Sequence, residues 1–74
     1  MTQIPTVKPL RLITYIKKKG FIEIRQVGSH KFFKHPNGKT TVVPFHKGRD
    51  IGRGLLRSIL DDCGITIQEF IKKQ

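Results

Sequence analysis

The chain has 74 residues, enough for one small domain over 1–74 with a modest core and too few for a second fold. Its 15 Lys and Arg against 5 Asp and Glu give a net charge of +10, which favours nucleic acid as the partner, then an anionic membrane, over a neutral metabolite. A single cysteine excludes an internal disulfide, and neither a signal-peptide core nor a membrane-length apolar run is present, so we expect a soluble cytoplasmic protein.

The first expected element is a helix that begins at Pro9, after a loose leader over residues 1–8. Proline suits a first helical turn, and Gly20 should end the helix with Phe21 folding back onto it. The basic last turn, 17–19, is either a solvated helix end or a phosphate contact. The buried face of this helix is expected to carry Leu10, Leu12, Ile13 and Ile16.

A strand is expected next, over residues 21–27. Ile22 and Ile24 should lie on a buried face, and Glu23 and Arg25 on a solvated one.

Two turn signals then predict an antiparallel meander. Gly28-Ser29 allows only a tight reversal into a second strand over 30–35. Residues 36–38, Pro-Asn-Gly, form a turn into a third strand over 40–44. Three strands of this size need helices over one face to be stable.

The last third of the chain predicts those helices. After a loop over 45–52, one helix ends at Gly64, and Thr66-x-x-Glu69 reads as a capping box that opens a short final helix. Their inward residues are expected to be Leu55, Leu56, Ile59, Leu60 and Cys63, then Ile67, Phe70 and Ile71. The predicted fold is therefore α+β, in the order α-β-β-β-α plus a short C-terminal helix, with the helices on one face of the sheet.

The charges are concentrated in the middle of the chain. Residues 24–49 contain no Asp or Glu, yet they hold all three histidines. The same stretch carries Arg25, Lys31, Lys34, Lys39, Lys47 and Arg49. We therefore expect the hairpin and the loop after it to form the positive face.

Several short motifs occur in a characteristic order over residues 9–71. They are Gly20-Phe21, Arg25-Gln26-x-Gly28-Ser29-His30, His35-Pro36-x-Gly38, Val43-Pro44-x-His46, Leu56-x-x-Ile59-Leu60, Gly64 and Glu69-Phe70. This set resembles the HicA family of toxins. The resemblance implies a double-stranded-RNA-binding-like fold, an mRNA interferase activity without a cofactor, His30 as the catalytic residue, and neutralisation by a HicB-type antitoxin.

The residues around His30 suit that chemistry. Metal-free RNA cleavage needs a proton taken from the ribose 2′-OH and one delivered to the leaving 5′-oxygen, and a histidine can do either at neutral pH. Gly28 permits close backbone approach, and Ser29 can donate a hydrogen bond to phosphate. Lys31 or Lys47 could stabilise the growing charge. The expected RNA-binding or supporting residues are Arg25, Gly28, Ser29, Lys31, Lys34, His46 and Lys47.

Other interpretations of the histidines remain open. His30 could be an ordinary exposed strand residue, and His46 either a loop residue or a second active-site group. His35, before Pro36, suits turn packing. The spacing of the three histidines matches no familiar metal-ligand pattern.

Two pairs of residues, one aromatic and one basic, each have two possible roles. Phe32 and Phe33 should lie on opposite faces of the sheet, one in the core and the other stacked on a base or covered by the antitoxin. Arg53 and Arg57 are either a phosphate-binding stripe or a solvated helix face.

The sequence thus predicts a toxin ribonuclease that acts on RNA. The alternative is a non-catalytic RNA-binding module that uses the same basic face. A membrane-surface protein is a weaker third reading, because the cations lie on strands and loops rather than on an amphipathic basic helix.

Overall fold

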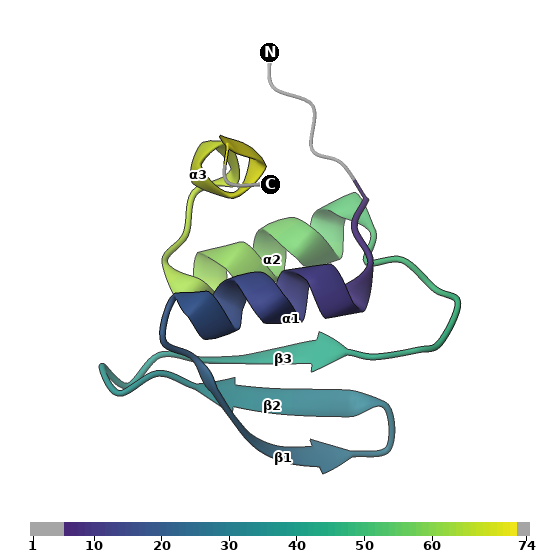
Figure 1. Ribbon diagram of the computed structural model, residues 1–74, viewed down its shortest axis with the longest axis horizontal. Helices are drawn as coiled ribbons and strands as arrows, with labels where there is room; N and C mark the ends of the chain where they lie inside the picture. The colour runs from purple at the N-terminus through teal and green to yellow at the C-terminus, as the bar shows by residue number, and fades with distance from the viewer. Residues whose placement is uncertain (1–5, 73–74) are drawn as a thin grey trace.

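The computed structural model describes residues 6–72 and shows an α+β architecture (Figure 1). The bounds of its elements are α1 (Pro9–Lys18), β1 (Ile22–Val27), β2 (His30–Lys34), β3 (Thr40–Pro44), α2 (Arg53–Cys63) and α3 (Ile67–Lys72). The predicted order of helices and strands is confirmed. The strands form one antiparallel sheet in the order β1-β2-β3. Within residues 6–72, no helix combines the length and the apolar character needed to cross a membrane.

Helix α1 starts and stops as its sequence predicts. Pro9 occupies the first turn, where a missing N–H costs nothing. At the other end Gly20 adopts a φ of 102°, its N–H donates to the Lys17 carbonyl at 3.0 Å, and the Phe21 N–H donates to the Ile16 carbonyl at 3.1 Å. This pair of bonds is a Schellman closure, and it returns Phe21 to the core with 3% of its surface exposed.

Glycine turns connect the strands where the sequence predicts them. Gly28 has a φ of 59° in the two-residue turn between β1 and β2, the sign that a type II′ hairpin requires at its first central position. Between β2 and β3, Gly38 has a φ of 98° and donates its N–H to the His35 carbonyl at 2.9 Å. The Asn37 side-chain oxygen accepts from the Lys39 N–H at 2.9 Å.

The core lies between the two long helices and β3. Helices α1 and α2 lie side by side over this end of the sheet, and their main sheet contacts are with β3 (Figure 1). Cys63 is buried among the apolar side chains, as predicted. The buried hydroxyl of Thr41 donates to Asp62 at 3.1 Å, which ties β3 to α2. The largest fully buried side chains are Leu12, Ile16, Phe33, Val43, Leu56, Ile59, Leu60 and Phe70.

Strand β1 projects beyond the helical layer, and it is the strand farthest from α1 and α2 (Figure 1). Ile22 is 60% exposed and Ile24 is 56% exposed, so the prediction that they form a buried face is wrong. One reason is a bulge between Glu23 and Arg25, which shifts the simple alternation of faces. The other is position, because the helices pack on the opposite end of the sheet.

Two leucines predicted to face the core are exposed. Leu10 is 64% exposed and Leu55 is 42% exposed. Leu10 lies four residues before Thr14, so the two share the outer stripe of α1. The buried stripe of the helix consists of Pro9, Leu12, Ile13 and Ile16. Leu55 lies beside the buried stripe of α2, which begins at Leu56.

The structured domain begins earlier than predicted. Val7 is 5% exposed and pairs with Ile51, with N–H to carbonyl bonds of 3.2 and 2.6 Å in the two directions. The loose leader therefore does not extend to residue 8. Residues 1–5 of that leader lie outside the described part of the chain.

The short helix α3 is held against α1 by polar and aromatic contacts. The Thr66 hydroxyl accepts from the Glu69 N–H at 3.1 Å, which is the Thr half of the predicted capping box. The Glu69 carboxylate forms an ion pair with Lys19 and accepts from the Tyr15 hydroxyl at 3.4 Å. The rings of Tyr15 and Phe70 meet edge to face with centroids 5.0 Å apart.

Candidate nucleic-acid interface and active site

The face of the sheet turned away from the helices is called the open face below. Phe33 is fully buried on the helical side, so the alternate residues His30, Phe32 and Lys34 of β2 lie on the other side. Their directly paired neighbours on β1 and β3 share that face. The open face consists of Ile22, Arg25, Val27, His30, Phe32, Lys34, Thr40, Val42 and Pro44. This set includes an arginine, a histidine and a lysine, and no carboxylate.

An aromatic ring and a guanidinium stack at the centre of the open face. Arg25 lies over the ring of Phe32, with 4.6 Å between its guanidinium carbon and the ring centroid. Phe32 is half-buried, while Phe33 has no exposed surface, so the prediction that one of the two belongs to the core is confirmed. Such a cation–π pair places a flat, positively charged surface where a base and a phosphate could bind together.

His30 is the first residue of β2 and is exposed. Val27 and Pro44 are its partners on the neighbouring strands, so apolar residues flank it on both sides. Among the hydrogen bonds within residues 6–72, none uses the His30 ring. Both ring nitrogens therefore point to no protein partner in the described part, which leaves them available to a ligand on the open face.

The turn before His30 is fastened to the loop after β3. Ser29 Oγ lies 3.1 Å from His46 Nε2, and the Phe45 N–H donates to the Ser29 carbonyl. His46 is exposed. The structure thus brings Ser29 and His46 together beside His30, at one end of the open face.

Lys31 lies on the other side of the sheet from His30. Its ammonium contacts the Glu23 carboxylate at 3.3 Å and the Gln26 side-chain oxygen at 3.1 Å, and it sits 5.2 Å from the centroid of Phe45. These contacts occupy Lys31 and fix the hairpin on the helical side. The structure does not bring Lys31 and His30 to a common surface.

The remaining predicted residues are spread around this centre. Gly28 and Lys47 are exposed, in the turn before His30 and in the loop after β3. Arg53 and Arg57 are exposed on α2, so they lie in the helical layer rather than on the open face. Within residues 6–72, no three His, Cys, Asp or Glu side chains gather as a set of metal ligands.

His35 has a structural role, as predicted from its position in the turn before Pro36. Its Nδ1 accepts from the Asn37 N–H at 3.0 Å, so Nε2 carries the proton and donates to the Lys19 carbonyl at 3.0 Å. The ring also meets Phe21 edge to face at 5.0 Å. His35 therefore connects the end of α1 to the turn between β2 and β3, close against Gly20.

One part of this site was not found from the sequence. The stacking of Arg25 on Phe32 depends on the bulge in β1, because without it Ile24 would stand opposite Phe32. The strand Ile22–Val27 alternates apolar and polar residues up to Arg25 like a regular strand, so its sequence did not mark the bulge.

Comparison with known families gives a match that covers this site. Residues 11–65, more than half of the chain, match the family model described as HicA toxin of bacterial toxin-antitoxin. The matched span includes the whole sheet and α2. A search of curated proteins finds no match. HicA toxins are in general ribonucleases that cleave mRNA, and they occur with a cognate antitoxin. The chain therefore belongs to the HicA family, as the toxin component of a toxin–antitoxin system.

Proposed function

We propose that this toxin is a metal-independent endoribonuclease that cleaves mRNA in the cytoplasm, with His30 as general acid or base, and that a HicB-type antitoxin neutralises it. The observation that carries the proposal is the exposed ring of His30 on the open face, which has Arg25 and Lys34 but no carboxylate. That arrangement suits a polyanion with a reactive hydroxyl group.

The proposed reaction is an attack within one nucleotide. The ribose 2′-oxygen forms a bond to phosphorus as its proton is removed, and the bond from phosphorus to the 5′-oxygen breaks as that oxygen gains a proton. The products are a 2′,3′-cyclic phosphate and a free 5′-OH. His30 performs one of the two proton transfers, each of which contributes typically about 10²–10⁴-fold to rate.

The neighbours of His30 have supporting roles in this proposal. The Phe32 ring with Arg25 stacked on it holds a base, and Lys34 holds a phosphate on the same face. The Gly28-Ser29 turn approaches the scissile phosphate, and His46, bound to Ser29, is the candidate for the second proton transfer. Lys47 in the exposed loop contacts RNA, whereas Lys31 supports the hairpin through Glu23.

The direct test is cleavage of a labelled RNA in EDTA by wild-type protein and by His30→Ala. We expect cyclic-phosphate and 5′-OH ends from the wild type, and a rate at least about 100-fold lower from the variant. His30 is exposed, so circular dichroism and the unfolding midpoint should not change. Undiminished cleavage by His30→Ala would refute its role, and 5′-phosphate ends would indicate a hydrolytic mechanism instead.

The alternative is a non-catalytic RNA-binding module, which the stacked Arg25 and Phe32 would serve equally well. It predicts no cleavage and an affinity that falls steeply with salt, because phosphate contacts release counterions. A gel of labelled RNA, with and without incubation, separates the two functions.

A further inference from the structure

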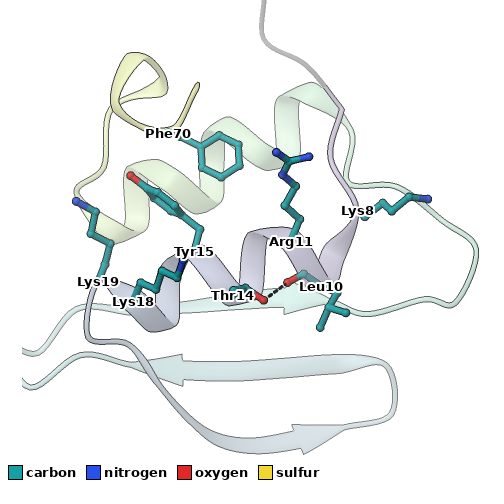
Figure 2. Close-up of a pocket in the computed structure, with 8 residues that line it drawn as sticks. All are labelled: Lys8, Leu10, Arg11, Thr14, Tyr15, Lys18, Lys19 and Phe70. Atoms are coloured by element: carbon teal, nitrogen blue, oxygen red, sulfur yellow. Dashed lines mark hydrogen bonds between the residues drawn. The ribbon is translucent and has the colours of Figure 1, made fainter. Parts of the chain in front are cut away.

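A groove of about 710 Å³ lies in the helical layer, and none of the residues that line it belongs to the sheet. It follows the outer stripe of α1 and reaches α3 (Figure 2). Leu10 and Tyr15 form its apolar part, with the buried ring of Phe70 beneath them, and Lys8, Arg11 and Lys18 lie along it. Figure 2 shows Arg11 and Tyr15 rising from α1 on the side of Phe70, with Lys8 at one end and Lys19 at the other.

The apolar part of the groove includes a side chain that the fold does not bury. Leu10 is 64% exposed, in a helix whose other leucine and two isoleucines are at most 4% exposed. A partner that covers Leu10 would remove apolar surface from water, which is the main driving force for association. Leu10 and Lys18 are eight residues apart on a helix, roughly 12 Å, so the groove matches two to three turns of a partner helix.

The positive charge of the groove favours an acidic partner. Within residues 6–72, the side chains of Lys8, Arg11 and Lys18 form no ion pair or hydrogen bond. Lys19 differs, because Glu69 pairs with it and raises its pKa. The groove therefore presents unpaired positive charge beside apolar surface. A second copy of this chain carries +10 itself and would be repelled.

The aromatic rings favour a protein segment over RNA. Single-stranded RNA binds where an aromatic ring offers an open face to a base. Here Lys19 Nζ lies over the Tyr15 ring at 5.7 Å from the centroid, and a compact ammonium, unlike the planar guanidinium of Arg25 over Phe32, offers no flat surface to a base. Phe70 meets the Tyr15 ring at right angles and is itself fully buried. Neither ring is placed for stacking, whereas an amphipathic helix needs only an apolar floor with charges beside it.

We propose that this groove binds an acidic amphipathic helix of the antitoxin, an inference that rests on the proposed toxin function. The apolar side of that helix covers Leu10 and Tyr15, and its carboxylates pair with Lys8, Arg11 and Lys18. The antitoxin is then anchored on the helical layer, away from His30, so anchoring and inhibition are separate contacts. An antitoxin anchored here would bind active and inactive toxin equally well.

Tyrosine emission offers a direct test, because Tyr15 is the one tyrosine of the chain and there is no tryptophan. The probe is a synthetic 16-residue peptide of Glu and Leu, without aromatic residues, whose leucines recur at helical spacing. Two control peptides have the same composition with the leucines out of register, or Lys in place of Glu. The protein is the full chain, as wild type and as His30→Ala. We expect a saturable change in emission with the acidic helical peptide, equal in both proteins, and at least about tenfold weaker binding of either control peptide.

Matched variants locate the contact. Arg11→Glu should weaken peptide binding by about tenfold and Leu10→Ser by several-fold, whereas Arg57→Glu and Leu55→Ser on α2 should change it less than twofold. Both Arg11→Glu and Leu10→Ser alter exposed positions, and circular dichroism checks their fold. Lys18→Glu provides a second charge reversal in the groove.

Three results would overturn the groove assignment: equal binding of the control peptides, equal effects of Arg57→Glu and Arg11→Glu, or no change in emission. If a 12-nucleotide RNA instead shifts the NMR signals of Leu10 and Tyr15 and the peptide does not, the groove is an RNA surface. The two proposals fail separately. Peptide binding without RNA cleavage would end the nuclease proposal alone, and cleavage by a protein that binds no peptide would end the groove proposal alone.

Discussion

The two ends of the sheet differ in what covers them. At the β3 end, Val43 and Thr41 are buried under α1 and α2, and the Thr41 hydroxyl is bonded to Asp62. At the β1 end, every residue of the strand is exposed or half-buried, and Ile22 and Ile24 are among the most exposed apolar residues of the described chain. Strand β2 lies between them, and its two faces differ: Phe33 faces the core, and His30 faces solvent.

This difference separates stability from function. Burial of apolar surface stabilises the fold mainly at β3 and the helices. The hairpin of β1 and β2 is held by its ladder, by the bulge and by the contacts of Lys31, so its open face is free to carry side chains that suit a ligand. We therefore expect substitutions in the buried part of the sheet to affect stability, and substitutions on the open face to affect RNA binding and cleavage.

Substitutions of the two neighbouring phenylalanines of β2 should differ most in their effect on stability. Phe33→Ala removes a fully buried ring and should lower the free energy of unfolding by about 3–5 kcal/mol. Phe32→Ala removes a ring from the open face and should cost less than about 1 kcal/mol. The same Phe32→Ala change should weaken RNA binding by about 1–3 kcal/mol. Denaturant unfolding and RNA titration of both variants measure this, and equal loss of stability would contradict the division.

Substitution of the glycine at the end of α1 should cause the next largest loss of stability. Gly20 has a φ of 102°, and an added Cβ would lie 2.7 Å from His35 Nε2. Gly20→Ala should therefore cost about 1–3 kcal/mol, through backbone strain and through the displaced bond of His35 to Lys19. Gly54→Ala is the control, because Gly54 lies in α2 with open space around it and alanine is the better helix former. Similar unfolding midpoints for the two variants would argue against this close packing.

The burial of Cys63 should make the stability of the fold depend on pH in alkaline solution. Burial, aided by the charge of Asp62, raises the pKa of the thiol to about 12, whereas an unfolded cysteine titrates near 8.5. Above about pH 8.5 the unfolded chain loses this proton and the folded chain keeps it, so the free energy of unfolding falls as the pH rises toward 12. Unfolding measured at pH 7, 9 and 10.5 should show a steeper decline for wild type than for Cys63→Ala. Parallel curves would mean that the thiol is not sequestered.

Local signals were enough to predict most of the fold. The glycines at 20, 28, 38 and 64 mark turns or helix ends, and all four adopt positive φ. The ordered motifs around Gly28-Ser29-His30 indicated the family, and the match over residues 11–65 confirms it. These features depend on neighbours in the sequence, so they could be predicted without the tertiary structure.

The errors concern positions that depend on tertiary packing. The alternation of Ile22 and Ile24 gave no sign that the helices would pack at the far end of the sheet, or that β1 contains a bulge. The assignment of Leu10 to the core ignored its helical spacing to Thr14, which places it on the outer stripe. Lys31 and His30 are adjacent in the chain, but strand alternation places their side chains on opposite faces of the sheet, so proximity in sequence is a poor guide to a shared site.

The most direct test of the central claim, that the open face acts and the rest of the molecule supports it, is expression of wild type and His30→Ala in the same bacterial host. Growth and the integrity of mRNA are followed together, with the soluble level of each protein matched by immunoblot. The account predicts growth arrest and mRNA loss with the wild type, and neither with the variant. Arrest and mRNA loss by His30→Ala at an equal soluble level would contradict it.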